Sequence, residues 1–141
     1  MKKVLIAVEG GPLTEIVVQH GIELAKLLNG EIGFIYAVDA TGFIGEGGYT
    51  AQNFVQELHK EALELFNRLK SEFNIQQSWK FIEDGKPASK IVETANEWKA
   101  DYIVIGTHGR TGVSHLLMGS VAEHVIRHSK RPVLVIPKGI T

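Results

Sequence analysis

The stretch YIVIGTHGRTGVSHLLMGSV, residues Tyr102–Val121, decides the expected fold. It opens with Ile103–Ile105, a short apolar run that is typical of a buried strand. Gly106 ends that run, and further glycines keep the next residues irregular. A periodic segment, Ser120–Ser129, follows and is expected to be a helix. The stretch therefore predicts a strand, a glycine-rich loop and a helix start in direct succession.

A strand that leads through a glycine loop into a helix start can hold a phosphate group. Glycine lets a ligand approach the backbone closely, and a helix N-terminus offers unpaired N–H groups and partial positive charge. Ser120 lies three residues before Glu123, which is the spacing of a capping box. A merely glycine-rich connection would look the same, so spacing alone leaves both interpretations open.

The spacing of the glycines carries a family resemblance. Gly106, Gly109 and Gly119, followed by Ser120, give the pattern Gly-x2-Gly-x9-Gly-Ser. This pattern resembles the nucleotide-binding signature of the universal stress protein family, in its ATP-binding branch. The resemblance extends to the closing segment Pro132–Pro137 and so covers the chain, residues 1–141, as one universal stress protein domain.

Composition is ordinary for a single globular domain. The chain has 141 residues, of which 44% are hydrophobic and 22% charged, and its net charge is −1. No overall basic charge draws it to nucleic acid or to a membrane surface. The chain contains no cysteine, which excludes disulfides and thiolate sites. Val4–Val8 is too short for a membrane span or a signal-peptide core, so we expect a cytoplasmic protein.

Strand and helix patterns alternate along the chain. Strands are expected at Val4–Val8, Ile32–Val38, Ser78–Ile82, Ile103–Ile105 and Val133–Ile136, and helices at Leu13–Leu28, Ala51–Phe73, from about Pro87, and at Ser120–Ser129. Such alternation predicts an α/β fold with an open, five-stranded parallel sheet and helices on both faces. The resemblance implies the strand order 3-2-1-4-5 of the adenine nucleotide alpha-hydrolase-like fold.

That order places the binding crevice at the carboxyl ends of strands 1 and 4, where the chain changes direction across the sheet. The residues that the resemblance implies in nucleotide binding are Val8, Glu9, Ala37, Val38, Gly106, His108, Gly109, Arg110, Gly119, Ser120 and Val121. The glycines and Ser120 would contact ribose and phosphates, and the strand 2 residues would hold adenine through their backbone. We expect the main-chain amides of Gly109, Gly119 and Ser120 to converge on one anion-sized hollow.

Some of these positions leave alternatives open. Glu9 stands where the family commonly has Asp, and Gly11 where many members have Ser. Arg110 is either a phosphate partner or a solvated loop residue. His124 and His128 have the spacing of a two-histidine metal site, but the sequence shows no third ligand nearby, so we assign no metal there.

Other catalytic motifs are absent from the sequence. It contains no Gly-x4-Gly-Lys-Ser/Thr loop, no Gly-x-Ser-x-Gly elbow and no His-Glu-x-x-His. We therefore expect no dedicated catalysis and at most a weak ATPase, and the sequence leaves enzyme status open.

The resulting hypothesis is an ATP-binding regulatory protein of the stress response, with Mg²⁺ or Mn²⁺ accompanying the nucleotide. It would act through an unidentified downstream protein. The alternatives are a dimeric scaffold that no longer binds nucleotide and a nucleotidyltransferase-like enzyme. Dimerisation is a separate prediction. In the strand order that the resemblance implies, Val133–Ile136 would lie at a sheet edge and pair with its copy in a second chain to form a homodimer.

Overall fold

The computed structural model describes residues 1–108 and 118–139. Its elements are β1 (Lys3–Ala7), α1 (Thr14–Leu27), β2 (Glu31–Val38), α2 (Ala51–Glu72), β3 (Trp79–Asp84), α3 (Pro87–Trp98), β4 (Tyr102–Gly106), α4 (Ser120–His128) and β5 (Val133–Ile136). Each expected strand and helix is present, with ends that differ from the expectation by at most two residues.

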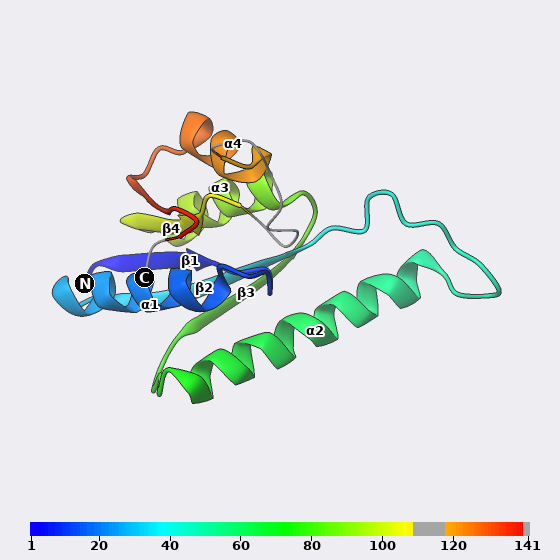
Figure 1. Ribbon diagram of the computed structural model, residues 1–141, viewed down its shortest axis with the longest axis horizontal. Helices are drawn as coiled ribbons and strands as arrows, with labels where there is room; N and C mark the ends of the chain where they lie inside the picture. Colours follow the sequence, from blue (N-terminus) through cyan, green and yellow to red (C-terminus); the bar gives the residue numbers. More distant parts are fainter. Residues whose placement is uncertain (109–117, 140–141) are drawn as a thin grey trace.

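The five strands form one parallel sheet in the order β3-β2-β1-β4-β5, as predicted. Figure 1 shows α1 and α2 on one side of this sheet and α3 and α4 on the other. Side chains alternate between the two cores along β1: Val4 and Ile6 pack on the α1 and α2 side, and Leu5 and Ala7 pack on the α3 and α4 side. Burial on both faces explains why β1 is a continuous apolar run.

The first two helices end in the same hydrogen-bonded motif. After α1, Asn29 takes a left-handed conformation with φ 52°, and the Gly30 N–H donates to the Ala25 carbonyl at 2.8 Å. After α2, Asn74 has the same φ of 52°, and the Ile75 N–H donates to the Lys70 carbonyl at 2.9 Å. These bonds satisfy carbonyls that a helix end leaves unpaired, and they turn the chain back toward the next strand.

The segment between β2 and α2, residues 39–50, is folded against the start of α2. Phe43 stacks on Phe54 of α2 with ring centroids 4.8 Å apart, and Tyr49 meets Phe43 edge-on at 5.7 Å. The Tyr49 hydroxyl donates to the Glu57 carboxylate, and this bond raises the pKa of Tyr49 to about 12. An aromatic cluster therefore fixes a segment that extends well beyond the sheet (Figure 1).

Within the described residues, no helix combines the length and the apolar character needed to cross a membrane.

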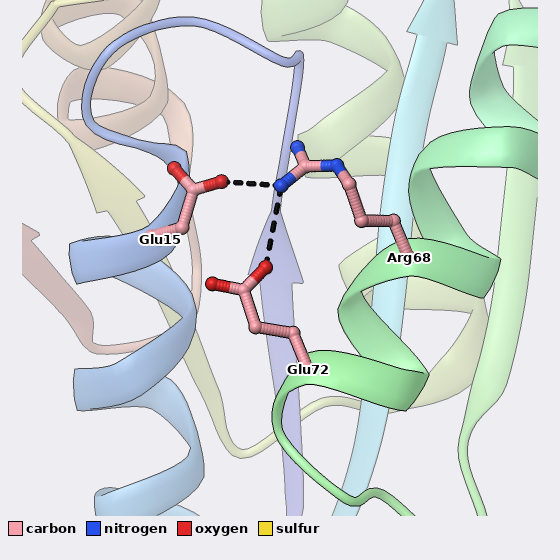
Figure 2. A network of polar contacts seen from close by, with 3 residues as sticks. All are labelled: Glu15, Arg68 and Glu72. Atoms are coloured by element: carbon pink, nitrogen blue, oxygen red, sulfur yellow. Dashed lines mark hydrogen bonds and ion pairs between the residues drawn. The ribbon is translucent and has the colours of Figure 1, made fainter.

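A polar network joins the two helices on the α1 side of the sheet (Figure 2). Arg68 of α2 donates to Glu15 of α1 at 2.5 Å and to Glu72, one turn along α2, at 3.3 Å. The three side chains are about half exposed, so the network is a surface feature. The bond from Arg68 lowers the pKa of Glu15 and raises that of Arg68.

Stability should depend on this network only while Glu15 is ionised. Its pKa is lower in the folded than in the unfolded chain, so the contribution is complete above the unfolded value and is lost as pH falls through the lowered folded value. We expect Glu15→Gln to reduce the free energy of unfolding by less than about 1 kcal/mol at neutral pH. Urea unfolding at decreasing pH should show the difference from wild type shrinking to zero. Glu64→Gln on α2 is the control, and a difference that persists in acid would contradict this assignment.

Candidate functional site

The predicted site lies at the carboxyl ends of β1 and β4, the two strands that flank the point where the chain reverses across the sheet. After β1 the chain enters α1 on one face, and after β4 it reaches α4 on the other. The carboxyl ends of these strands and the starts of α1 and α4 therefore lie at the same end of the sheet. The structure also has a hollow of about 600 Å³ at the opposite end of the sheet, where β2 and β3 start. None of the predicted site residues lines this hollow.

The end of β2 offers a donor and an acceptor from one residue. The Val38 carbonyl accepts the Gly85 N–H at 2.9 Å on the β3 side, and the Ile35 carbonyl accepts the Val8 N–H at 3.0 Å on the β1 side. Because neighbouring residues of a strand direct their backbone groups to opposite sides, Ala37 directs its N–H and C=O toward β1. These groups lie past Ala7, where β1 ends. Of the two predicted adenine-binding residues, the geometry favours Ala37 over Val38.

The segment after β1 brings an unpaired hydroxyl to the same edge. Val8 is buried, Glu9 is partly exposed, and Gly10 has a φ of 81° that turns the chain toward α1. Thr14, the first residue of α1, is only 3% exposed, and its Oγ1 has no hydrogen-bond partner among the residues that the structure describes. The sequence pattern does not single out Thr14, because Leu13 occupies the N-cap position, where a hydroxyl residue would be a recognisable signal.

The start of α4 is tied directly to the end of β4. The Gly119 N–H donates to the Thr107 carbonyl at 2.6 Å. The expectation that this amide is free to bind an anion is therefore wrong, because the chain itself occupies it. Ser120, Val121 and Ala122 follow in the first turn, and their N–H groups have no carbonyl partner inside the helix. If a phosphate binds at α4, these three amides are the donors.

The capping-box prediction at this helix is also wrong. Gly119, and not Ser120, is the N-cap, and within the described part of the chain no side chain caps the helix. The Glu123 N–H donates to the Gly119 carbonyl at 3.1 Å, which is the first intrahelical bond expected of an N-cap residue. Ser120 is exposed at the first helical position and does not serve as the N-cap.

The signature glycines that the structure describes allow close contacts between elements. A Cβ on Gly119 would lie 3.1 Å from the Thr107 carbonyl oxygen, and one on Gly106 would lie 3.2 Å from both Leu13 Cδ1 and Val17 Cγ2 of the α1 region. Neither glycine has a positive φ, so steric space explains them and backbone conformation does not. Thr107 contacts Gly119 through its backbone carbonyl. Because every residue has such a carbonyl, the identity of Thr107 in the sequence does not predict this contact.

Of the remaining predicted residues, the structure describes the histidines and does not describe Gly109 and Arg110. His108 is 8% exposed, and its Nδ1 lies 3.1 Å from the Thr107 hydroxyl, so the ring packs at the junction of β4 and α4. Gly109 and Arg110 lie outside the described residues. On α4, the Nδ1 of His128 lies 2.9 Å from the His124 carbonyl. The described part of the chain has no group of three side chains suited to hold a metal ion.

Comparison with known proteins places this arrangement in a family. The model of the universal stress protein family matches residues 1–137. The chain belongs to the universal stress protein family. A curated relative, universal stress protein MJ0531 of Methanocaldococcus jannaschii, is 38% identical over 141 residues, which cover 97% of this chain and 82% of the relative. Universal stress protein MJ0577 of the same organism is 27% identical over 97% of this chain and 95% of its own length.

Solved structures share the fold of this universal stress protein. The structure of MJ0577 has a TM-score of 0.81 at 27% identity and covers 99% of this chain and 98% of its own. A universal stress protein crystallised with cAMP has a TM-score of 0.70 at 22% identity, covering 96% of each chain. The Archaeoglobus fulgidus protein in complex with dAMP has a TM-score of 0.64 at 23% identity, covering 96% of this chain and 98% of that one. The fold is that of the adenine nucleotide alpha-hydrolase-like domains.

Proposed function

We propose that this universal stress protein binds an adenine nucleotide, ATP with Mg²⁺ or Mn²⁺, as a regulatory ligand in a stress response. The observation that carries the proposal is the register at the end of β2, which directs the Ala37 N–H and carbonyl toward the β1 side, beyond the last residue of β1. Solved structures of family members with cAMP and with dAMP support it. Hydrolysis is slow or absent in this proposal, because the sequence provides neither a phosphate lysine nor a dedicated base.

The Ala37 backbone suits adenine in particular. Adenine carries an acceptor at N1 beside a donor at N6, so the Ala37 N–H can donate to N1 while its carbonyl accepts from N6. Guanine carries the reverse order, a donor at N1 and an acceptor at O6. The same pose would place two donors together and two acceptors together, and each mismatched polar group costs free energy.

The phosphates would lie at the start of α4. The N–H groups of Ser120, Val121 and Ala122 and the positive end of the helix dipole both favour an anion there. In this proposal Glu9, two residues after the end of β1, would contact a ribose hydroxyl or the metal ion. Arg110 stays a prediction as a phosphate partner.

Calorimetry with ATP and Mg²⁺ tests the proposal, with GTP and Mg²⁺ as the matched control. We expect ATP to bind at or below millimolar concentration and GTP to bind more weakly by about fivefold to a hundredfold, since a two-bond base contact discriminates by about 1–3 kcal/mol. The absence of ATP binding at millimolar nucleotide would discard the function. Equal affinity for GTP would discard the role of Ala37 while leaving a phosphate site.

One observation favours the scaffold alternative. The Gly119 amide is already paired with Thr107, and Glu9 and Gly11 depart from the family pattern, so part of the expected phosphate cradle is missing. A scaffold without nucleotide would purify with no adenine absorbance and would show no heat with ATP. Adenine absorbance that co-purifies with the folded chain would remove this alternative.

We further propose a homodimer through β5. Among the described strands, β5 pairs with β4 alone, and its Leu134 is 38% exposed. An exposed apolar edge strand favours pairing with a second copy, although Pro132 and Pro137 at its ends could also serve to limit such pairing.

Light scattering at micromolar concentration should give the mass of two chains. Leu134→Lys should shift the mass to that of one chain, because a charge on the edge opposes pairing. Leu63→Lys, on an exposed part of α2, is the control and should leave the mass unchanged. A wild-type mass of one chain would contradict the dimer.

A further inference from the structure

The hollow at the end of the sheet where β2 and β3 start has no part in the proposed function. Its volume of about 600 Å³ falls within the range of about 300–1,000 Å³ that is usual for small-molecule sites. The end of α2 and the starts of β2 and β3 form its walls, and they lie together because the chain reverses direction after α2 at Asn74 (Figure 1). The hollow is therefore a candidate for a second, separate site.

Two lysine side chains give the hollow a positive character. Lys70, in the last turn of α2, and Lys80, at the second position of β3, both line it. Neither forms a salt bridge with a carboxylate in the part of the chain that the structure describes. Among the described lining residues Glu31 alone is acidic, and its Oε1 already accepts the Trp79 indole N–H at 3.2 Å. Two unpaired ammonium groups beside one engaged carboxylate favour an anion.

A backbone N–H adds a third donor. Val38 directs its carbonyl toward β3, where it accepts the Gly85 N–H. Residues an even number of positions apart on a strand direct their backbone groups to the same side, so the Ile32 N–H also faces β3. The ladder between β2 and β3 begins one residue later, where Gly33 pairs with Trp79. The Ile32 N–H thus precedes the ladder and faces the hollow, which Ile32 lines.

Trp79 supplies an apolar surface next to these donors. It is the first residue of β3, lines the hollow and is 53% exposed. Its hydrogen bond to Glu31 joins it to the adjacent strand and holds the indole in place. The flat ring of a ligand can stack on an indole, and such stacking adds affinity beyond that of the buried area.

We propose that this hollow binds a small organic anion that carries a flat ring, of the class of aryl phosphates and aromatic dicarboxylates. The ring stacks on Trp79, and the anionic groups lie between Lys70 and Lys80. The two cations and the exposed ring together define this class, because either feature alone would accept a simpler ligand. The site is separate from the proposed nucleotide crevice, which lies at the carboxyl ends of β1 and β4.

Phenyl phosphate and phthalate are the probes, and they distinguish a phosphate ester from a dicarboxylate. Titrations at constant ionic strength, followed by tryptophan fluorescence and calorimetry, should give half-saturation at or below about 1 mM for at least one of them. Inorganic phosphate and phenol each offer half of the recognised chemistry and should bind at least about tenfold more weakly. Absence of saturable binding of both probes would overturn the inference, and so would equal affinity for inorganic phosphate.

Substitutions in the hollow locate the bound probe. Lys70→Gln and Lys80→Gln should each weaken binding of the tighter probe by about threefold, and together by about tenfold. Lys60→Gln is the matched control, because it removes the same charge from an exposed position of α2 outside the hollow. By calorimetry, Trp79→Leu should lower the affinity to that of inorganic phosphate, whereas Trp79→Phe keeps a ring and should stay within about threefold of wild type.

The variant with both lysines replaced also separates this inference from the proposed function. It should bind ATP as the wild type does, because the nucleotide crevice lies at the other end of the sheet. Unchanged probe binding in this variant would place the probe elsewhere on the chain and would overturn the inference. Failure of the wild-type chain to bind ATP would discard the proposed function, whereas probe binding that depends on the two lysines would still support this site.

Discussion

Gly119→Val is expected to abolish nucleotide binding while the chain still folds. The nearest atom to a Cβ at this position is the Thr107 carbonyl oxygen at 3.1 Å, and the valine methyl groups would require still more space. That oxygen belongs to the backbone and already accepts the Gly119 N–H at 2.6 Å. The start of α4 must therefore move away from the end of β4, and the amides of Ser120 and Val121 move with it.

Calorimetry with ATP and Mg²⁺ should show at least about a hundredfold loss of affinity for Gly119→Val, which corresponds to about 2.8 kcal/mol. Gly119→Ala, with a single added carbon, should lose less. Circular dichroism and urea unfolding serve as the control for folding. Binding of ATP by Gly119→Val at wild-type affinity would show that the α4 start takes no part in the site.

The largest loss of stability is expected from Phe66→Ala. Phe66 is 1% exposed on α2, and its ring lies 6.0 Å from that of Phe34 on β2, centroid to centroid. Replacing a buried phenylalanine with alanine costs about 3–5 kcal/mol through lost burial and the cavity left behind. Since a domain of this kind is stable by about 5–15 kcal/mol, this is a large part of the total.

Urea unfolding at neutral pH measures this effect directly. Leu63→Ala is the matched control, because Leu63 lies on the same helix and is 49% exposed, so its loss should be within about 1 kcal/mol. A loss below about 1 kcal/mol for Phe66→Ala would mean that α2 does not pack against β2 as described.

Patterns that are local in sequence predicted local structure well. The apolar run of β1 is a strand buried on both faces, and Asn29-Gly30 ends α1. The strand order needed the family resemblance, because the spacing of elements does not specify which strands are neighbours. It is confirmed as β3-β2-β1-β4-β5.

The parts of the candidate site that are formed by backbone atoms were harder to predict from the sequence. A capping box was expected at Ser120 because Ser and Glu have the right spacing, but Gly119 is the N-cap of the helix. The choice between Ala37 and Val38 depends on which side of β2 each carbonyl faces, and side-chain identity does not reveal that. These features arise from pairing between strands, which a single sequence does not display.

Contacts between helices and strands that are far apart in the sequence could not be predicted either. His59 of α2 is 25 positions from Asp84 in the chain, yet its Nε2 lies 2.6 Å from Asp84 Oδ1 at the end of β3. Arg68 likewise meets Glu15 across 53 positions. Such pairs depend on how α2 is placed over the sheet, which no local pattern specifies.

The hydrogen bond from Gly119 to Thr107 also bears on how this chain can vary. It joins Thr107, directly after β4, to Gly119, the N-cap of α4, through backbone atoms alone. The bond is therefore insensitive to which side chain stands at position 107, and variation there need not disturb the junction of β4 and α4.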